Sequence, residues 1–267
     1  PSKRALMQSR LYKRLRAHGL ESFDQYRALL ESGAGSAERH ELISAITTNV
    51  TRFLREPHHF EELRAEVLPP LLAEARRGGR IRIWSAGCAT GEEPYSLAFT
   101  VLDLFPEAPR HDIRILATDL DPGVIRSAAR GCYPEAGLAP LAPEARHRYF
   151  RSAAPGHHAV REDPRRLVTF RVLNLLGGWP FRGAFDVIFC RNVVIYFDAE
   201  TQRRLWPRFA GAQTRPGARL FIGHSERVSD EARAFYRLGR GASYVRTDLP
   251  APATGSLHLP PPMDRSA

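Results

Sequence analysis

The segment Arg80–Ser96 constrains the fold of this chain more than any other. It reads RIRIWSAGCATGEEPYS, which predicts a short apolar strand, a tight turn with Gly87 and Gly91, and the start of a helix. Glycine permits positive φ and a close approach of the backbone to a ligand. A strand-turn-helix of this type is where α/β sheets bind nucleotide-like cofactors. An ordinary turn between a strand and a helix explains the two glycines equally well.

The charge of this turn disfavours a phosphate ligand. The phosphate-binding patterns G-x-x-x-x-G-K-[ST] and G-x-G-x-x-G are absent from the segment. Glu92 and Glu93 stand at the start of the helix instead. A cationic ligand therefore fits better, and S-adenosylmethionine (SAM) carries both a sulfonium and an ammonium group. Taken alone, Glu93 is equally an acid that stabilises a helix start.

Two further apolar segments end in polar side chains suited to a ligand. Residues 113–119 read IRILATD, and an acid such as Asp119 at a strand end accepts hydrogen bonds from ribose hydroxyls. A helix N-cap is an equally good interpretation of Asp119 in isolation. Residues 185–197 read FDVIFCRNVVIYF, which predicts a strand covered on both faces and is too short to span a bilayer. Arg191 and Asn192 then lie at the carboxyl end of a strand, where ligands bind.

The order of elements predicts an α/β fold preceded by helices. From Arg80 onward strands and helices alternate, which is typical of a mostly parallel sheet. We therefore predict a helical domain with a linker helix over residues 1–79 and an α/β domain over residues 80–247. Residues 133–166 are longer than an ordinary loop and form a predicted insertion. Residues 248–267 are rich in Pro, Ala, Gly and Ser, which predicts a disordered tail.

Composition narrows the class of protein. Three scattered cysteines, without a C-x-x-C or Cys/His spacing, indicate a reduced cytoplasmic protein without a structural metal. The adjacent pairs His58-His59 and His157-His158 do not place two ligands on one helix face, so no metal site is expected. No segment looks like a signal peptide or a membrane-spanning helix. The net charge of +10 suits a nucleic acid or an acidic protein surface equally well.

Five motifs, in order and at similar spacing, resemble the CheR-type chemotaxis receptor (protein-glutamate) O-methyltransferases. They are TTNVTRFLRE (47–56), SAGCATGEEPYS (85–96), ATDLD (117–121), FDVIFCRNVVIYF (185–197) and GHSE (223–226). The resemblance runs from about Lys3 to Arg246. It implies a Rossmann-like class I SAM methyltransferase domain with an N-terminal helical domain and a small β-subdomain in the insertion. The family has more helix upstream, so we expect the helical domain to be truncated at its start.

The resemblance also implies an activity and a set of site residues. Enzymes of this family transfer a methyl group from SAM to a glutamate side chain of a bacterial chemoreceptor, which gives a glutamyl methyl ester and S-adenosylhomocysteine. Arg55 and Tyr196 match the residues near the substrate carboxylate. By position alone, Arg55 is also consistent with a surface arginine, and the apolar run around Tyr196 favours a core residue. The family's SAM contacts carry over to Asn49, Thr51, Arg55, Glu93, Asp119, Asn174, Leu175, Arg191 and Asn192.

The implied partner is the cytoplasmic helical bundle of a chemoreceptor. Arg10, Lys13 and Arg14 fall on one face of the first predicted helix, as a candidate docking surface or a solvated basic face. We expect a cytoplasmic monomer that neither inserts into a membrane nor binds nucleic acid. Residues 151–161 lack the two closely spaced glycines that tail-binding members show in this loop. We therefore expect methylation without a tether to the carboxyl terminus of the receptor.

Four other functions are weighed against this one. The net charge suits a SAM methyltransferase that acts on nucleic acid, although the two segments around Arg55 and Tyr196 match the receptor enzymes. A non-catalytic SAM-sensing module is disfavoured because the candidate site residues are intact. An NAD-dependent oxidoreductase is disfavoured because G-x-G-x-x-G is missing. A hydrolase is disfavoured too, since Gly223–Glu226 lacks the G-x-S-x-G pattern.

Overall fold

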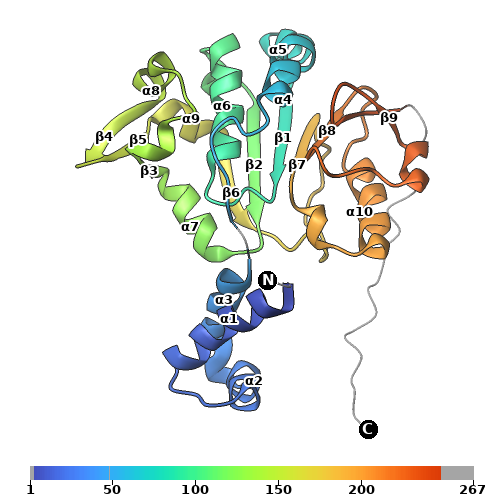
Figure 1. Cartoon of the computed structure of the whole chain (residues 1–267). Helices are drawn as coiled ribbons and strands as arrows, with labels where there is room; N and C mark the ends of the chain where they lie inside the picture. The colour runs from blue at the N-terminus through green and yellow to red at the C-terminus, as the bar shows by residue number, and fades with distance from the viewer. Residues whose placement is uncertain (1–2, 48, 248–267) are drawn as a thin grey trace. The chain divides into compact units, whose positions relative to one another are not determined.

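The computed structural model describes residues 3–47 and 49–247 of the chain (Figure 1). The chain divides into two compact units, Pro1–Trp179 and Pro180–Ala267. No helix among the described residues is long and apolar enough to cross a membrane. The predicted tail, residues 248–267, lies outside the described residues.

The first unit begins with three helices. They are α1 (Lys3–Ala17), α2 (Phe23–Glu31) and α3 (Ser36–Ile46), with a short 3-10 turn, η1 (Gly33–Gly35), before α3. A capping box starts α2: the Gln25 amide donates to the Ser22 hydroxyl, and the Ser22 amide donates to the Gln25 side chain. These two bonds satisfy amides that a helix start leaves without an intrahelical partner.

A buried carboxylate ties these three helices together. The Glu38 side chain, on α3, is 4% exposed. Arg14 on α1 donates to both of its oxygens, at 2.9 and 2.5 Å, and the Tyr26 hydroxyl on α2 donates at 2.6 Å. The hydrogen bonds from Arg14 are the main reason that the pKa of Glu38 falls to about 2. Arg14 therefore has a structural role within the helical domain.

A continuous helical stretch, residues 57–76, connects the N-terminal helices to the first strand of the sheet. It consists of α4 (Pro57–Glu62), a π-helical turn η2 (Leu63–Val67) and α5 (Leu68–Arg76). Pro57, Pro69 and Pro70 stand in first turns, where a missing amide hydrogen matters least. Pro69 and Pro70 have no amide hydrogen to donate to the preceding turn, which accounts for the wider π-helical turn just before them.

The first unit contains a three-stranded parallel sheet in the order β6-β2-β1. Its strands are β1 (Ile81–Ala86), β2 (Ile113–Asp119) and β6 (Val168–Val172). The helices α6 (Glu92–Leu104), α7 (Pro122–Arg130) and α9 (Glu162–Leu167) pack against them, and η3 (Ala108–Arg110) precedes β2. Four consecutive residues of β1, 83–86, are buried, as expected for a strand covered on both faces. The predicted parallel α/β arrangement is confirmed.

A second, smaller sheet fills the predicted insertion. Strands β3 (Cys132–Pro134), β5 (His157–Val160) and β4 (Phe150–Ala154) pair antiparallel in that order. Between β3 and β4 lie η4 (Glu135–Leu138) and α8 (Pro143–Tyr149). Phe53 is fully buried and lies edge-on to two rings of this sheet. Its ring centroid is 5.0 Å from that of Tyr133 on β3 and 5.6 Å from that of Phe150 on β4. This aromatic cluster anchors the chain just before Arg55.

The second unit contains four strands in the order β7-β8-β10-β9. They are β7 (Val187–Cys190), β8 (Arg219–Ile222), β10 (Ser243–Arg246) and β9 (Tyr236–Leu238); β7 and β8 are parallel and the others antiparallel. Helix α10 (Ala199–Gly211) starts at Asp198, whose carboxylate accepts the Thr201 amide at 2.7 Å. Two 3-10 turns complete the unit, η5 (Val194–Tyr196) and η6 (Asp230–Ala234). The strand predicted through residues 185–197 is thus wrong beyond Cys190.

Candidate functional site

The glycine turn after β1 has little room for side chains. Gly87 and Gly91 adopt φ of 93° and 98°, which only glycine reaches without strain. A Cβ on Gly91 would lie 2.8 Å from the Cβ of Ala128 and 2.9 Å from the Tyr133 hydroxyl. Position 91 therefore requires glycine both for its backbone conformation and for the packing of α7 and β3 against the turn.

Asp119 lies beside this turn, at the end of β2. Its Oδ2 accepts the Ala89 amide at 2.9 Å and its Oδ1 accepts the Asp121 amide at 3.1 Å. Asp121, not Asp119, is the N-cap of α7, since its carboxylate accepts the Gly123 amide at 2.7 Å. Burial raises the pKa of the Asp119 carboxyl above its ordinary value. Hydrogen-bond donors on a ligand would stabilise the charged form of this carboxylate.

Three carboxyl groups make the turn electrostatically negative. Glu93 accepts a hydrogen bond from the Ser85 hydroxyl at 2.7 Å, and Glu92 accepts one from the Thr90 hydroxyl at 2.6 Å. The thiol of Cys88 lies inside the same turn. Burial is the main cause that raises its pKa, and the charges of Asp119, Glu93 and Glu92 raise it further. The turn therefore favours a cationic ligand, as the sequence predicted.

The loop before α4 carries three more candidates. The Asn49 side chain donates to Asp121 Oδ2 at 3.1 Å, which connects this loop to the end of β2. Thr51 is half-buried. Arg55 is half-buried too, and one of its Nη atoms donates to the Val50 carbonyl at 3.1 Å.

The loop is held by backbone geometry as well. Leu54 and Glu56, on either side of Arg55, adopt φ of 51° and 55°, which is strained for residues with a side chain. The Leu54 amide donates to Ser96 of α6 at 3.0 Å. The Arg55 backbone is therefore fixed on both sides.

Asn174 and Leu175 lie in the turn that follows β6. The pairing of β2 with β6 sets Val172 opposite Asp119, so this turn leaves the same edge of the sheet. Asn174 accepts the Leu176 amide at 2.9 Å, and the Leu175 carbonyl accepts the indole N–H of Trp179 at 3.1 Å. The carboxyl edge of this parallel sheet thus carries Asn49, Glu93, Asp119, Asn174 and Leu175.

The second unit holds the remaining three candidates, Arg191, Asn192 and Tyr196. They follow β7 at its carboxyl end. Arg191 is 6% exposed and Asn192 has a left-handed backbone with φ of 59°. The Tyr196 side chain is 58% exposed, so the alternative that it is a core residue is wrong.

Glu226 organises this loop, a role that no pattern in the sequence identified. It is 3% exposed and accepts four backbone amides, those of Gly223, Asn192, Val194 and Ile195. A Cβ on Gly223 would lie 2.9 Å from its Oε2 and 2.7 Å from Asn192 Nδ2, so a larger residue there would displace these two side chains. The available signal was the GHSE motif, an acid placed shortly after a buried strand.

Comparisons with known proteins decide the family. The CheR methyltransferase SAM-binding domain matches residues 49–242, and the CheR methyltransferase all-alpha domain matches residues 1–47. A probable chemotaxis protein methyltransferase of Rhizobium etli is 52% identical over 235 residues, which cover 87% of this chain and 87% of that protein. The chain belongs to the CheR methyltransferase family.

Other relatives support the same family assignment. The chemotaxis protein methyltransferase of Salmonella typhimurium is 41% identical over 244 residues, which cover 89% of this chain and 81% of that protein. The one from Borreliella burgdorferi is 38% identical over 231 residues, with 85% and 81% covered. This CheR protein is therefore a chemotaxis-type methyltransferase, and SAM is its cofactor.

The residues at the carboxyl edge of the first unit fit SAM. The sulfonium and the ammonium of SAM are cations, and the turn after β1 presents three carboxyl groups around Cys88. The half-buried Asp119 carboxylate is a hydrogen-bond acceptor of the kind that binds ribose hydroxyls. Gly91 keeps the turn free of a side chain at its crowded end.

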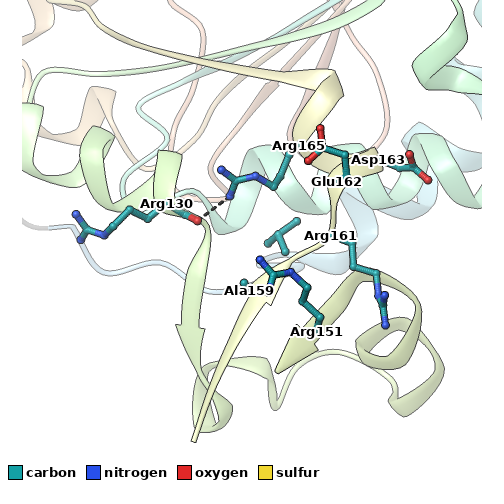
Figure 2. Close-up of a pocket in the computed structure, with 8 residues that line it drawn as sticks. Arg130, Arg151, Ala159, Arg161, Glu162, Asp163 and Arg165 are labelled. Carbon is teal, nitrogen blue, oxygen red and sulfur yellow. Dashed lines mark hydrogen bonds between the residues drawn. The ribbon is translucent and has the colours of Figure 1, made fainter. Parts of the chain in front are cut away.

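The β-subdomain of this CheR protein carries a separate, arginine-lined hollow of about 540 Å³ (Figure 2). Arg165 of α9 donates to the Arg130 and Ala129 carbonyls, at 2.7 and 3.0 Å, and so covers the end of α7. None of the lining residues is among the candidate SAM contacts. They are Arg130, Arg151, Ala159, Val160, Arg161, Glu162, Asp163 and Arg165.

Proposed function

We propose that this protein methylates glutamate side chains on the cytoplasmic helical bundle of a chemoreceptor, with a glutamyl methyl ester and S-adenosylhomocysteine as products. Membership of the CheR family supports chemotaxis-type methyl transfer from SAM. Arg55 supports the choice of a carboxylate as the substrate. Its backbone lies between two left-handed residues, and its guanidinium donates to the Val50 carbonyl at 3.1 Å. Such a group suits the planar carboxylate of a glutamate.

The proposed chemistry requires little of the protein beyond positioning. A glutamate carboxylate has a free pKa of about 4.3, so it is ionised near neutrality and needs no general base. SAM would supply an electrophilic methyl group. The leaving group, S-adenosylhomocysteine, is a neutral thioether, so no general acid is needed. Correct placement of two reactants is worth roughly 7–11 kcal/mol.

Each candidate residue receives a role on this proposal. Arg55 binds one oxygen of the substrate carboxylate and leaves the other to attack. In the second unit, the exposed Tyr196 is the other candidate substrate residue. Asp119 accepts the ribose hydroxyls, and Glu93 faces the ammonium end of the cofactor. The remaining proposed cofactor contacts are Asn49, Thr51, Arg55, Asn174, Leu175, Arg191 and Asn192.

The proposal extends to the docking surface on α1. The three basic residues considered for it differ in exposure. Lys13 is exposed, whereas Arg10 and Arg14 are half-buried. Arg10 donates to the Ile46 and Thr47 carbonyls at 2.9 and 3.0 Å, and Arg14 binds Glu38. We therefore propose Lys13 as the docking cation among the three. We also propose a cytoplasmic monomer that binds no nucleic acid, with domains 1–79 and 80–247 and an insertion at about 133–166.

The deciding experiment transfers a radiolabelled methyl group from SAM to purified receptor cytoplasmic fragments. Label that alkali releases as methanol identifies an ester, and its loss in a fragment whose acceptor glutamates are replaced by alanine identifies the site. Alkali-stable label, or label on a nucleic acid instead of the receptor, contradicts the proposal. A parallel reaction on fragments without their last residues tests the proposed lack of a tether, which predicts an unchanged rate.

A further inference from the structure

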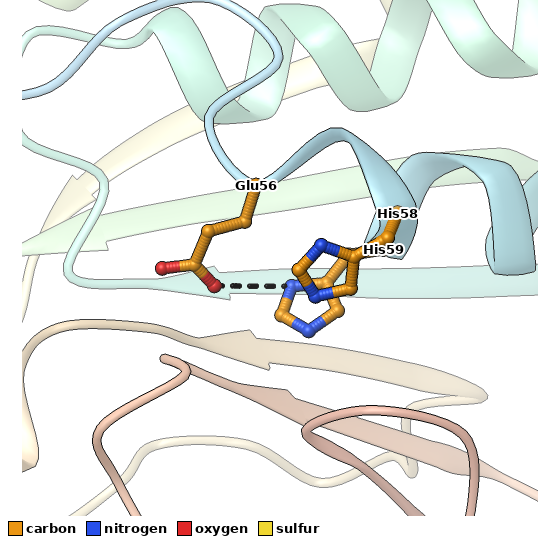
Figure 3. A group of neighbouring side chains, drawn as sticks. All are labelled: Glu56, His58 and His59. Atoms are coloured by element: carbon orange, nitrogen blue, oxygen red, sulfur yellow. Dashed lines mark ion pairs between the residues drawn. The ribbon is translucent and has the colours of Figure 1, made fainter.

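Glu56, His58 and His59 form a cluster of metal-ligating groups at the start of α4 (Figure 3). Each offers one ligand atom, and the three atoms lie within 4.8 Å of one another. Glu56 Oε2 lies 3.5 Å from His59 Nδ1. The imidazole rings of His58 and His59 have centroids 4.2 Å apart. All three residues belong to the first unit.

The backbone explains why neighbouring histidines form a cluster that the helix pattern did not predict. Adjacent residues on a helix do not share a face, which argued against a ligand pair. Glu56, however, stands just before the helix with φ 55° and ψ 70°. This left-handed turn directs its carboxylate back toward His59, as Figure 3 shows. Such a conformation costs about 1–3 kcal/mol and marks places where strain serves a function.

Burial and donor type point to one class of ion. The His59 side chain is fully buried, that of Glu56 is 12% exposed, and His58 is exposed. The pair Glu56–His59 thus offers a partly dehydrated site, and His58 offers access from solvent. Two imidazoles and one carboxylate suit Zn²⁺, with Cu²⁺ and Ni²⁺ as competitors. Tetrahedral Zn²⁺ needs its ligand atoms about 3.3 Å apart. Glu56 and His59, at 3.5 Å, are close to this separation, and the exposed His58 would have to move toward them.

We propose that Glu56, His58 and His59 bind one divalent transition metal ion, with Zn²⁺ favoured by the donor set. Solvent occupies the remaining coordination positions. The site follows Arg55 directly in the chain, so the bound ion holds the end of the loop that carries this candidate substrate residue.

Titration calorimetry with ZnCl₂ on the full chain, without a histidine tag, tests the site. The parent protein should bind one ion per chain, and His58→Ala and Glu56→Gln should each weaken binding by at least about tenfold. His58 is exposed, so His58→Ala should keep the parent's melting temperature. The matched control is the double variant His157→Ala/His158→Ala, which removes the other adjacent pair, on β5. It should bind Zn²⁺ like the parent.

Equal Zn²⁺ affinity in the parent and in folded His58→Ala or Glu56→Gln overturns the proposal, as does loss of binding in the control variant. Co²⁺ spectra give a second readout. Nitrogen and oxygen ligation predicts d–d bands without thiolate charge transfer. A thiolate band would assign the ion to the exposed Cys132 and would also overturn the site.

Discussion

The carboxylate of Glu226 accepts the backbone amide of Asn192 at 2.9 Å, across 34 residues of sequence. The same Oε2 accepts the Gly223 amide at 2.5 Å, while Oε1 accepts the amides of Val194 and Ile195 at 2.9 and 3.3 Å. Glu226 thereby holds the loop in which Asn192 is left-handed. It is a positioning residue for the segment that carries Arg191, Asn192 and Tyr196.

Glu226→Gln should therefore lower stability by about 1–3 kcal/mol, because an amide NH₂ replaces one acceptor and leaves buried N–H groups unsatisfied. Urea denaturation measures the change. The matched control is Glu200→Gln on α10, where the exposed pair with Arg204 contributes little. An equal loss of unfolding free energy in both variants would show that Glu226 has no special role in holding the loop. A lower kcat at saturating SAM, in protein that remains folded, would further separate positioning from simple stability.

Tyr196→Phe and Arg55→Ala should each reduce turnover on the order of 10- to 100-fold, since both side chains are proposed to orient the substrate carboxylate. Thermal stability of Tyr196→Phe should match the parent, because this side chain is 58% exposed. Tyr12→Phe, at another exposed tyrosine, is the control and should keep full activity. Full activity of Tyr196→Phe would show that its hydroxyl has no direct role. Unfolding of Arg55→Ala would make that arginine structural.

The helical domain should lose stability in acid. Hydrogen bonds from Arg14 lower the pKa of Glu38 from 4.5 to about 2 in the folded state, so the unfolded state binds a proton first. This contribution to stability is complete above about pH 4.5 and disappears as the pH falls toward about 2. Thermal melts of the parent and of Glu38→Gln between pH 7 and pH 3 measure it. The variant should be less stable at pH 7 and less sensitive to acid; parallel curves for the two proteins would contradict the assignment.

Lys13→Glu should raise the apparent KM for the receptor without changing SAM affinity, because this exposed cation is the proposed docking contact. Added salt should raise the KM of the parent more than that of the variant, since salt screens charges at the surface. Arg14→Glu is not a clean test of docking, because it also breaks the bond to the buried Glu38. Lys13→Glu with the parent's KM at low salt would exclude Lys13 from the interface.

The sequence predicted the parallel sheet and the turn after β1 because their signals are local. Apolar runs, paired glycines and acids at a helix start all lie within a few residues of one another, as in Arg80–Ser96. The three-stranded sheet of the insertion, in contrast, was expected only through the family resemblance. Its strands are short, and the central strand, β5, comes after both of its partners in the sequence.

The contacts that the sequence did not reveal join distant residues. The apolar run after Cys190 was predicted to continue as a strand, but Glu226 binds its amides and turns it into η5. Arg14 was considered for docking, yet Glu38, 24 residues later, holds it. The approach of Glu56 to His59 depends on a left-handed residue that is not glycine. Periodicity and propensity carry no information on such pairings.

The central claim is that SAM binds at the carboxyl edge of the first unit's sheet, and Asp119 tests it most directly. Calorimetry should show that Asp119→Asn weakens SAM binding by roughly 1–3 kcal/mol, which is about 5- to 150-fold in Kd. Asp112→Asn, just before the start of β2, is the matched control; its carboxylate pairs with Arg82 at 2.7 Å and is 52% exposed. That variant should bind SAM like the parent. Unchanged SAM affinity in a folded Asp119→Asn protein would contradict the account.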